Sequence, residues 1–147
     1  MTQRINVAQH VPDVYRHYLA VEKLLLDSEL PTSTLELVKL RASQINGCGY
    51  CVDMHSRDMK KAGESDERLW SVAAWRDTTV FTPAERAALA LTEEATRLAD
   101  RAVVSDEVWQ GAAEHYNDKQ LSLLVVAIAM INAWNRINVT ARITPGT

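Results

Sequence analysis

Two cysteines, one histidine and one glutamate are the side chains of this sequence best suited to chemistry. Cys48 and Cys51, the only cysteines of the chain, form a Cys-x2-Cys pair. His55 follows Cys51 by four residues, and Glu36 precedes Cys48 by twelve. On a helix, His55 would lie one turn beyond Cys51, where its imidazole can reach the sulfur. Because a nearby histidine or a helix N-terminus generates the reactive thiolate at neutral pH, the pattern indicates redox chemistry with a built-in acid–base partner.

Other interpretations of the same residues stay open at this point. The cysteines could be two small buried hydrophobic residues. Glu36, Cys48, Cys51 and His55 could also be four zinc ligands, although a structural zinc site usually draws on two pairs of Cys or His. A c-type haem would need a histidine directly after the second cysteine, where Val52 stands. The sequence also leaves open which thiol has the lower pKa, because Cys48 lies closer to a helix N-terminus whereas Cys51 has His55.

The bulk properties predict one domain, residues 1–147, with a hydrophobic core. The net charge of -3 gives no basic patch for nucleic acid. The first ten residues lack the apolar core of a signal peptide. The longest apolar run, Leu123 to Ile131, is shorter than the ~20 residues that span a bilayer. We therefore expect a soluble cytoplasmic protein with no membrane partner, in which a Cys-x2-Cys pair is more often catalytic or metal-binding than structural.

The pattern of apolar residues and start signals predicts an all-α fold with no strand. Helices are expected after the capping box Thr82-Pro83-Ala84-Glu85, and after Ser65 and Ser105 as N-caps. The predicted bounds are Pro12 to near Ser28, Ser33 to about Ala62 with a break, Thr82 to about Leu98, and about Lys119 to Val139. The last helix is apolar almost all round, which is typical of a helix in a core or in an oligomer interface.

The central segment predicts a helix hairpin with the thiols at its corner. Asn46-Gly47 is a stop signal, and a second helix should begin near Cys48 and end at Gly63. Glu36 would lie ~15 Å before the turn and His55 ~12 Å after it, at ~1.5 Å per residue. Antiparallel helices would therefore bring Glu36 and His55 within about a turn of each other. Alternatively, Ser33 to Glu36 is itself a capping box, in which Glu36 would serve only its own helix start.

Polar and aromatic residues near the C-terminus carry weaker signals. Asn132, Asn135 and Arg136 interrupt the apolar surface of the last helix, so we expect them to bond the neighbouring chain, a second subunit or the active-site region. Trp134 is more typical of core or interface packing than of substrate stacking. Tyr50 is more typical of a packing aromatic.

The segment from Ala42 to His55, ASQINGCGYCVDMH, resembles the core of the AhpD-like alkylhydroperoxidases, within the carboxymuconolactone decarboxylase superfamily. Lys60 to Gly63, Phe81 to Ala90 and Asn132 to Arg136 are also similar to that family, so the resemblance covers most of the chain from about Pro31. It implies an all-helical domain that assembles into dimers, trimers or hexamers, with sites near subunit contacts.

The resemblance also implies a thiol peroxidase with no metal and no cofactor apart from its cysteines. Cys51 would attack the hydroperoxide, His55 would take its proton, and Glu36 would orient or relay to His55. Cys48 would condense with the resulting sulfenic acid to form a disulfide. An external dithiol, such as a lipoylated protein or a thioredoxin-like donor, would reopen it. One departure is Tyr50, where the best-studied peroxidase of the family has a second histidine, because a phenol is a poorer proton shuttle at neutral pH.

Two other functions compete with peroxidase activity. The first is a redox switch or disulfide exchanger, whose oligomer or partner changes with the state of Cys48 and Cys51. The second is a decarboxylase or lactone-processing enzyme, which the superfamily name suggests but which has no use for two vicinal thiols.

Overall fold

The computed structural model describes residues 1–146, and every regular element within them is helical, which confirms the all-α prediction. The elements are α1 Val7–His10, α2 Pro12–Leu26, α3 Thr32–Asn46, α4 Gly49–Lys61, α5 Asp66–Ser71, the 3-10 helix η1 Val72–Asp77, α6 Pro83–Thr96, α7 Leu98–Arg101, α8 Asp106–Ala113 and α9 Asp118–Ala141.

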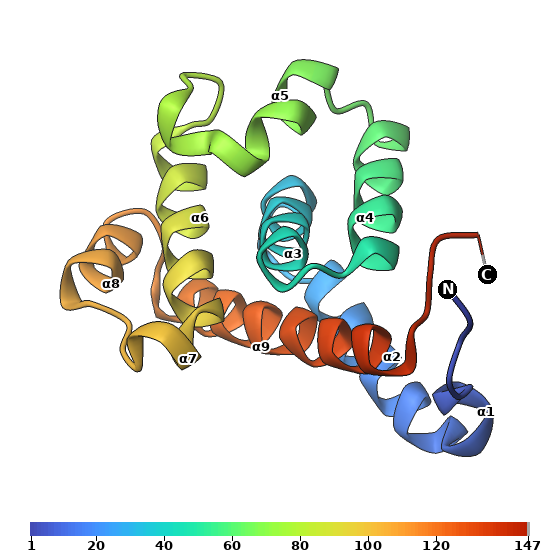
Figure 1. Ribbon diagram of the computed structural model, residues 1–147. Helices are drawn as coiled ribbons and strands as arrows, with labels where there is room; N and C mark the ends of the chain where they lie inside the picture. Colours follow the sequence, from blue (N-terminus) through green and yellow to red (C-terminus); the bar gives the residue numbers. More distant parts are fainter. Residues whose placement is uncertain (147) are drawn as a thin grey trace.

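Helix α3 runs through the middle of the molecule, and α4, α5, α6 and α9 surround it (Figure 1). Leu35, Val38 and Ala42 are fully shielded from solvent. One apolar cluster joins α3 to α2, α6, α8 and α9, and a second joins it to α4, η1 and α6. Because both clusters include residues of α3, the helix that carries Glu36 is held on all sides.

The turn between α3 and α4 forms where the stop signal predicts it. Gly47 adopts a left-handed φ of 69°, and its N–H donates to the Gln44 carbonyl at 3.3 Å. The Asn46 side chain donates to Asn132 at 2.9 Å and to Asn135 at 3.0 Å, both on α9. These two asparagines thus bond a neighbouring segment of the same chain and tie the hairpin corner to the last helix.

Most helix starts agree with the sequence signals, but the end of α6 and the start of α3 differ from the expected residues. The Thr82 capping box and the Ser65 and Ser105 N-caps are confirmed. Helix α6 ends at Thr96, two residues before the expected Leu98. Helix α3 begins at Thr32 after Pro31 with no side-chain cap, so the capping box that would have occupied Glu36 does not form. Glu36 is therefore free to serve the second helix of the hairpin.

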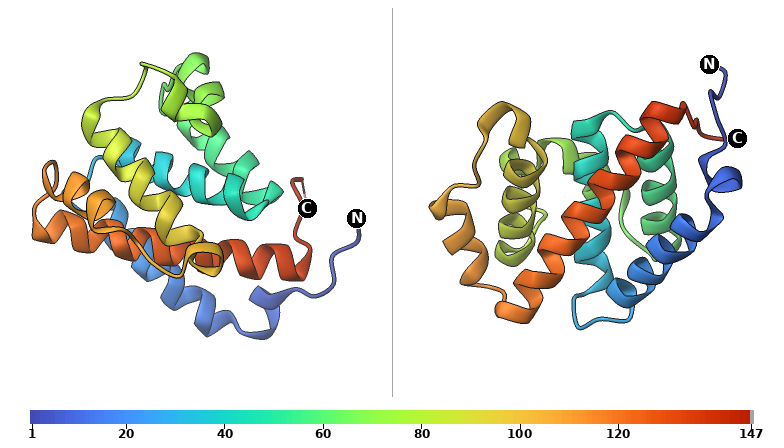
Figure 2. Two further views of the ribbon diagram at one scale, coloured as in Figure 1. Left: turned by 60° about the vertical axis from the view of Figure 1, so that its left-hand side comes forward. Right: turned by 90° about the horizontal axis from the view of Figure 1, so that it is seen from below.

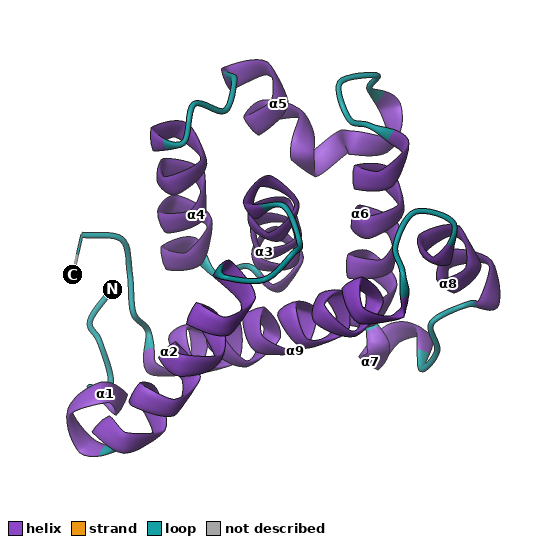
Figure 3. Ribbon diagram, turned by 180° about the vertical axis from the view of Figure 1, so that it is seen from behind, coloured by secondary structure: helices purple, strands orange, loops and turns teal. Residues whose placement is uncertain are grey.

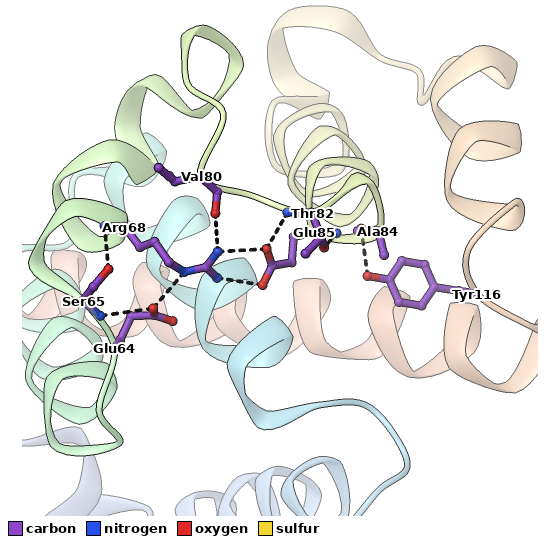
Figure 4. A network of polar contacts seen from close by, with 8 residues as sticks. All are labelled: Glu64, Ser65, Arg68, Val80, Thr82, Ala84, Glu85 and Tyr116. Atoms are coloured by element: carbon purple, nitrogen blue, oxygen red, sulfur yellow. Dashed lines mark hydrogen bonds and ion pairs between the residues drawn. The ribbon is translucent and has the colours of Figure 1, made fainter.

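A bidentate ion pair joins Arg68 on α5 to Glu85 in the first turn of α6 (Figure 4). Arg68 donates to both carboxylate oxygens of Glu85, at 2.7 and 3.1 Å, and to the Val80 carbonyl at 2.5 Å. The Tyr116 hydroxyl donates to the Ala84 carbonyl at 2.8 Å. These bonds fix the segment that closes the ring of helices around α3.

Helix α9 crosses the whole molecule, with α2 lying along one side of it (Figures 2 and 3). Arg4 N–H donates to the Ala141 carbonyl at 2.9 Å, so the N-terminal segment runs beside the end of α9. One side of α9 is buried in the core, as the prediction of a core or interface helix allows, whereas Val125, Val126 and Val139 are exposed in the single chain. Length and composition alone would let α9 cross a membrane, which is weak evidence because core helices of soluble proteins pass the same test.

Candidate functional site

Cys48 and Cys51 are joined in a disulfide at the first turn of α4. Cys48 is the N-cap of the helix, and its sulfur accepts the backbone N–H of Cys51 at 3.2 Å. Both residues are 1% exposed. The disulfide is therefore shielded from the outer surface, and a reactant can reach it only through a pocket in the protein.

A pocket of about 490 Å³ lies against one cysteine of this pair and not against the other. Cys51 is among the residues that line it, whereas Cys48 is not. Six further lining residues are aliphatic or thioether side chains and three are aromatic: Ala8, Leu19, Leu26, Met54, Ile131, Ile143, Tyr15, Tyr50 and Trp134. The pocket can therefore hold an apolar organic molecule against Cys51.

Glu36 and His55 meet across the hairpin in the wall of the same pocket. The Nδ1 of His55 lies 2.9 Å from Oε2 of Glu36, and His55 is 6% exposed. An ionised carboxylate can only accept, so a neutral His55 ring donates from Nδ1 and keeps its lone pair on Nε2. The pair is thus arranged as a base held in one orientation by a carboxylate.

Two further charged residues, Lys39 on α3 and Glu22 on α2, continue the series of charged contacts from the Glu36–His55 pair. Lys39, 5% exposed, lies 2.8 Å from Glu22 and 3.7 Å from Glu36. Glu22 in turn accepts the indole N–H of Trp134 at 3.1 Å. Sequence reasoning missed Lys39 and Glu22. A lysine within the mostly apolar stretch of α3 was a signal for the former, whereas nothing in the sequence marks Glu22.

These contacts decide the charge of Glu36. Burial raises the pKa of its carboxyl, but the hydrogen bond and charge of His55, with a smaller contribution from Lys39, outweigh burial and hold the pKa below its ordinary value. Glu36 is therefore ionised at neutral pH. An ionised Glu36 can accept the Nδ1 hydrogen bond from either a neutral or a protonated His55 ring.

The sulfur of Cys51 has a hydrogen-bond donor that the sequence reasoning did not identify. The side-chain Nδ2 of Asn138, in the last turns of α9, lies 3.3 Å from the Cys51 sulfur. In the described part of the chain, no hydrogen bond joins His55 to Cys51 while the disulfide is closed. Asn138 stands three residues after Asn135, on the face that the earlier asparagines already mark, which was a usable signal.

Two aromatic residues that the sequence assigned to packing lie in the pocket wall. Tyr50 is half-buried there, beside Cys51 in sequence. Trp134 contacts the rings of Tyr15 and Tyr18 edge-on, with centroids 5.2 and 5.3 Å apart. Trp134 thus packs against α2 and also lines the pocket.

Zinc ligation by Glu36, Cys48, Cys51 and His55 finds no support. Across residues 1–146, no group of three or more His, Cys, Asp or Glu side chains is arranged to hold a metal ion. Both cysteine sulfurs are bonded to each other, and Nδ1 of His55 faces the Glu36 carboxylate.

Known proteins resemble this chain in sequence and in fold. The sequence profile of the carboxymuconolactone decarboxylase family matches residues 12–94. The uncharacterized protein YdfG of Bacillus subtilis is 37% identical over 139 residues, which cover 95% of this chain and 94% of YdfG. The alkyl hydroperoxide reductase AhpD of Bradyrhizobium diazoefficiens is 46% identical, but over 37 residues, 25% of this chain and 20% of AhpD.

A solved structure is similar over nearly the whole chain. ATU0492 of Agrobacterium tumefaciens superposes with a TM-score of 0.93 at 35% identity, covering 99% of this chain and 100% of ATU0492. It is described as a protein of unknown function, with a suggested role in AhpD-type antioxidant defence.

Proposed function

This chain belongs to the carboxymuconolactone decarboxylase family, and from that premise we propose that it is a thiol-dependent peroxidase for organic hydroperoxides. One observation carries the proposal: the pocket reaches Cys51, beside the Glu36–His55 pair, while Cys48 lies outside its lining. This placement gives the two cysteines different roles. Cys51 meets the substrate, and Cys48 is held next to it as the second thiol. The AhpD-type neighbours agree with this function.

The first half-reaction consumes the hydroperoxide. His55 accepts the Cys51 proton on Nε2, and Glu36 stabilises the resulting imidazolium. The Cys51 thiolate attacks the terminal oxygen, the O–O bond breaks, and the departing alkoxide takes the proton from His55 to become an alcohol. Cys51 is left as a sulfenic acid, oxidised by two electrons.

The second half-reaction restores the dithiol. Cys48 attacks the Cys51 sulfur and expels hydroxide, which takes the Cys48 proton to form water, and the disulfide seen here results. An external dithiol then attacks Cys51 from the pocket. The Cys48 thiolate that leaves is stabilised by the Cys51 N–H at the start of α4. The second thiol of the donor displaces Cys51 and completes the exchange.

The burial of the disulfide favours a slender dithiol as the physiological donor. With both cysteines 1% exposed, the flat active-site surface of a thioredoxin-like protein has no direct access to either sulfur. A lipoyl-type dithiol on a flexible arm can enter a pocket of about 490 Å³. We therefore propose a lipoylated protein as the donor, ahead of a thioredoxin-like one.

Hydroperoxide consumption by the wild type and two cysteine variants tests this function. With dithiol present, the wild type should turn over cumene hydroperoxide, Cys51→Ser should be inactive, and Cys48→Ser should give at most one turnover. Omitting the dithiol should limit the wild type to a single turnover as well. Full turnover by Cys51→Ser would end the proposal.

A second candidate, disulfide exchange without peroxidase turnover, is favoured by one observation: the Cys48–Cys51 bond is closed and Cys48 is an N-cap, which makes it a good leaving group. A partner trapped as a mixed disulfide by Cys48→Ser or Cys51→Ser, without hydroperoxide turnover, would support it. A decarboxylase or lactone-processing reaction does not use a disulfide, so this role leaves the Cys48–Cys51 pair without a function. Activity on carboxymuconolactone that survives loss of both thiols would support that role.

We also propose that the protein works in the cytoplasm as a homo-oligomer of two, three or six subunits. The reducing cytoplasm supplies dithiols for turnover. Val125 and Val126 on α9 are exposed, as are Leu19 and Leu24 on α2, and such apolar side chains suit a subunit contact. Light scattering of the purified protein measures the subunit number.

A further inference from the structure

The sulfur of Cys51, the cysteine that lines the pocket, is hydrogen-bonded by a side chain from a distant part of the sequence. Asn138 is 6% exposed, and its Nδ2 lies 3.3 Å from the Cys51 sulfur. Its own carbonyl accepts the N–H of Ile143 at 2.9 Å and that of Arg142, which caps the end of α9. These bonds fix the backbone of Asn138, so its amide is held toward α4.

The chemistry of this contact changes with the state of the sulfur. A disulfide sulfur is a weak acceptor, whereas a thiolate carries a full charge, and hydrogen bonds to charged groups are roughly twice as strong as neutral ones. An amide donor therefore stabilises the thiolate much more than the thiol or the disulfide. An asparagine does not ionise, so it donates in the same way at every pH at which the protein is folded.

Each sulfur of the pair has its own donor. Cys48 receives the backbone N–H of Cys51 at 3.2 Å, and Cys51 receives the side chain of Asn138. The helix start thus serves the thiol outside the pocket, and Asn138 serves the thiol inside it. We propose that Asn138 is a catalytic residue that stabilises the Cys51 thiolate, both for attack on the hydroperoxide and as the last leaving group in re-reduction.

Other charged and titratable groups around the pocket also influence Cys51. They are His55, Asp58 and Tyr50 on α4, Glu36 and Lys39 on α3, and Glu22 and Tyr15 on α2. Of these side chains none is hydrogen-bonded to the Cys51 sulfur within the described chain, which leaves Asn138 as its direct side-chain donor. A merely structural Asn138 would fill space between α9 and α4 and leave the acidity of Cys51 unchanged.

The pH dependence of Cys51 alkylation separates these two roles. Iodoacetamide reacts with the thiolate, so its rate against pH gives the midpoint of Cys51 ionisation in a Cys48→Ser background. Adding Asn138→Leu, which removes the donor and keeps the volume, should raise that midpoint by about one pH unit, or about tenfold less thiolate below it. If the Leu variant does not fold, Asn138→Ala removes the donor without added bulk.

Asn135→Leu is the matched control. Asn135 is a buried amide one turn earlier on α9 that bonds Ser43 and Asn46 and not Cys51. It should lower thermal stability and leave the alkylation midpoint in place. An unchanged midpoint in the Asn138 variants, or an equal shift in the Asn135 control, would overturn the assignment.

The inference rests on the proposed function in taking Cys51 as the attacking thiol, yet its test needs no hydroperoxide. A raised midpoint in a protein without peroxidase turnover would uphold Asn138 and reject the peroxidase. Peroxidase turnover with an unmoved midpoint would uphold the peroxidase and reject Asn138.

Discussion

Replacing Glu36 by glutamine is the most direct test of the acid–base pair. The substitution keeps the shape of the side chain and removes its charge. Glu36 is ionised at neutral pH, and its bond to Nδ1 of His55 is 2.9 Å long. A hydrogen bond to a charged group contributes about 1.5–3 kcal/mol, and a neutral one about 1 kcal/mol. The imidazolium of the transition state should therefore lose about 0.5–2 kcal/mol of stabilisation, so kcat/KM should fall about 2- to 30-fold.

The assay is the dithiol-dependent reduction of cumene hydroperoxide at neutral pH, with thermal melting as a measure of intact folding. If Glu36 acts through His55, the effects of Glu36→Gln and His55→Gln will not add. In a His55→Gln background, Glu36→Gln should then cost less than about twofold. Glu29→Gln, at a surface position paired with Lys119 outside the pocket lining, is the charge-matched control.

Two results would refute this reasoning. One is a Glu36→Gln enzyme with wild-type kcat/KM, because the ion pair would then have no part in the reaction. The other is full additivity with His55→Gln, because Glu36 would then act independently of the ring that it contacts.

Four further predictions follow from neighbouring contacts. Glu93→Gln should lower the free energy of unfolding in urea by about 3 kcal/mol, because buried Arg41, 3.0 Å from Glu93, loses its charged partner; an unchanged midpoint would contradict this. The stability difference between wild type and Glu36→Gln should be full above pH 4.5, the ordinary Glu value, and should vanish as pH falls through the lower folded pKa; thermal melts across pH measure it. Glu22→Gln should lower kcat/KM about two- to fivefold by freeing Lys39 to compete for Glu36; steady-state kinetics that match the wild type would count against it. Cumene hydroperoxide should exceed both hydrogen peroxide and a carboxylated hydroperoxide in kcat/KM by at least about tenfold, because the pocket wall is mostly apolar and carries more carboxylates than cations; equal values would show that the pocket does not select.

The parts of the fold that could be predicted are those fixed by local chemistry. Thr82 and its capping box, and Gly47 with its left-handed φ of 69°, act within a few residues of themselves. The meeting of Glu36 and His55 was also within reach, because a tight turn between two helices leaves few possible registers. The capping-box alternative for Glu36 was wrong because α3 begins at Thr32, with Pro31 as its N-cap, so Ser33 lies inside the helix and cannot cap it.

The remaining parts of the site depend on helices far apart in the sequence. Glu22 on α2 and Asn138 on α9 reach the pocket only after tertiary packing chooses the rotation of each helix. The hydrophobic pattern predicts which face of a helix turns toward the core, but not its exact rotation. That is too imprecise to place the Asn138 amide 3.3 Å from the Cys51 sulfur. For a related reason the apolar circumference of α9 predicts a core or interface helix without choosing between them, since pattern alone does not show how much of a helix its own chain covers.

Glu22, Lys39 and Glu36 form a series of charged contacts from α2 to α3. This series explains why α2 belongs to the site although it lies outside the Cys-x2-Cys motif. Lys39 lies closer to Glu22, at 2.8 Å, than to Glu36, at 3.7 Å. Lys39 therefore pairs mainly with Glu22, and the main partner of the Glu36 carboxylate is His55. Without Glu22, a buried Lys39 would need another partner, and Glu36 is the carboxylate it already approaches. Trp134 holds Glu22 in place from α9, the helix that also carries Asn138. A shift of α2 against α9 would then alter the base and the pocket wall together.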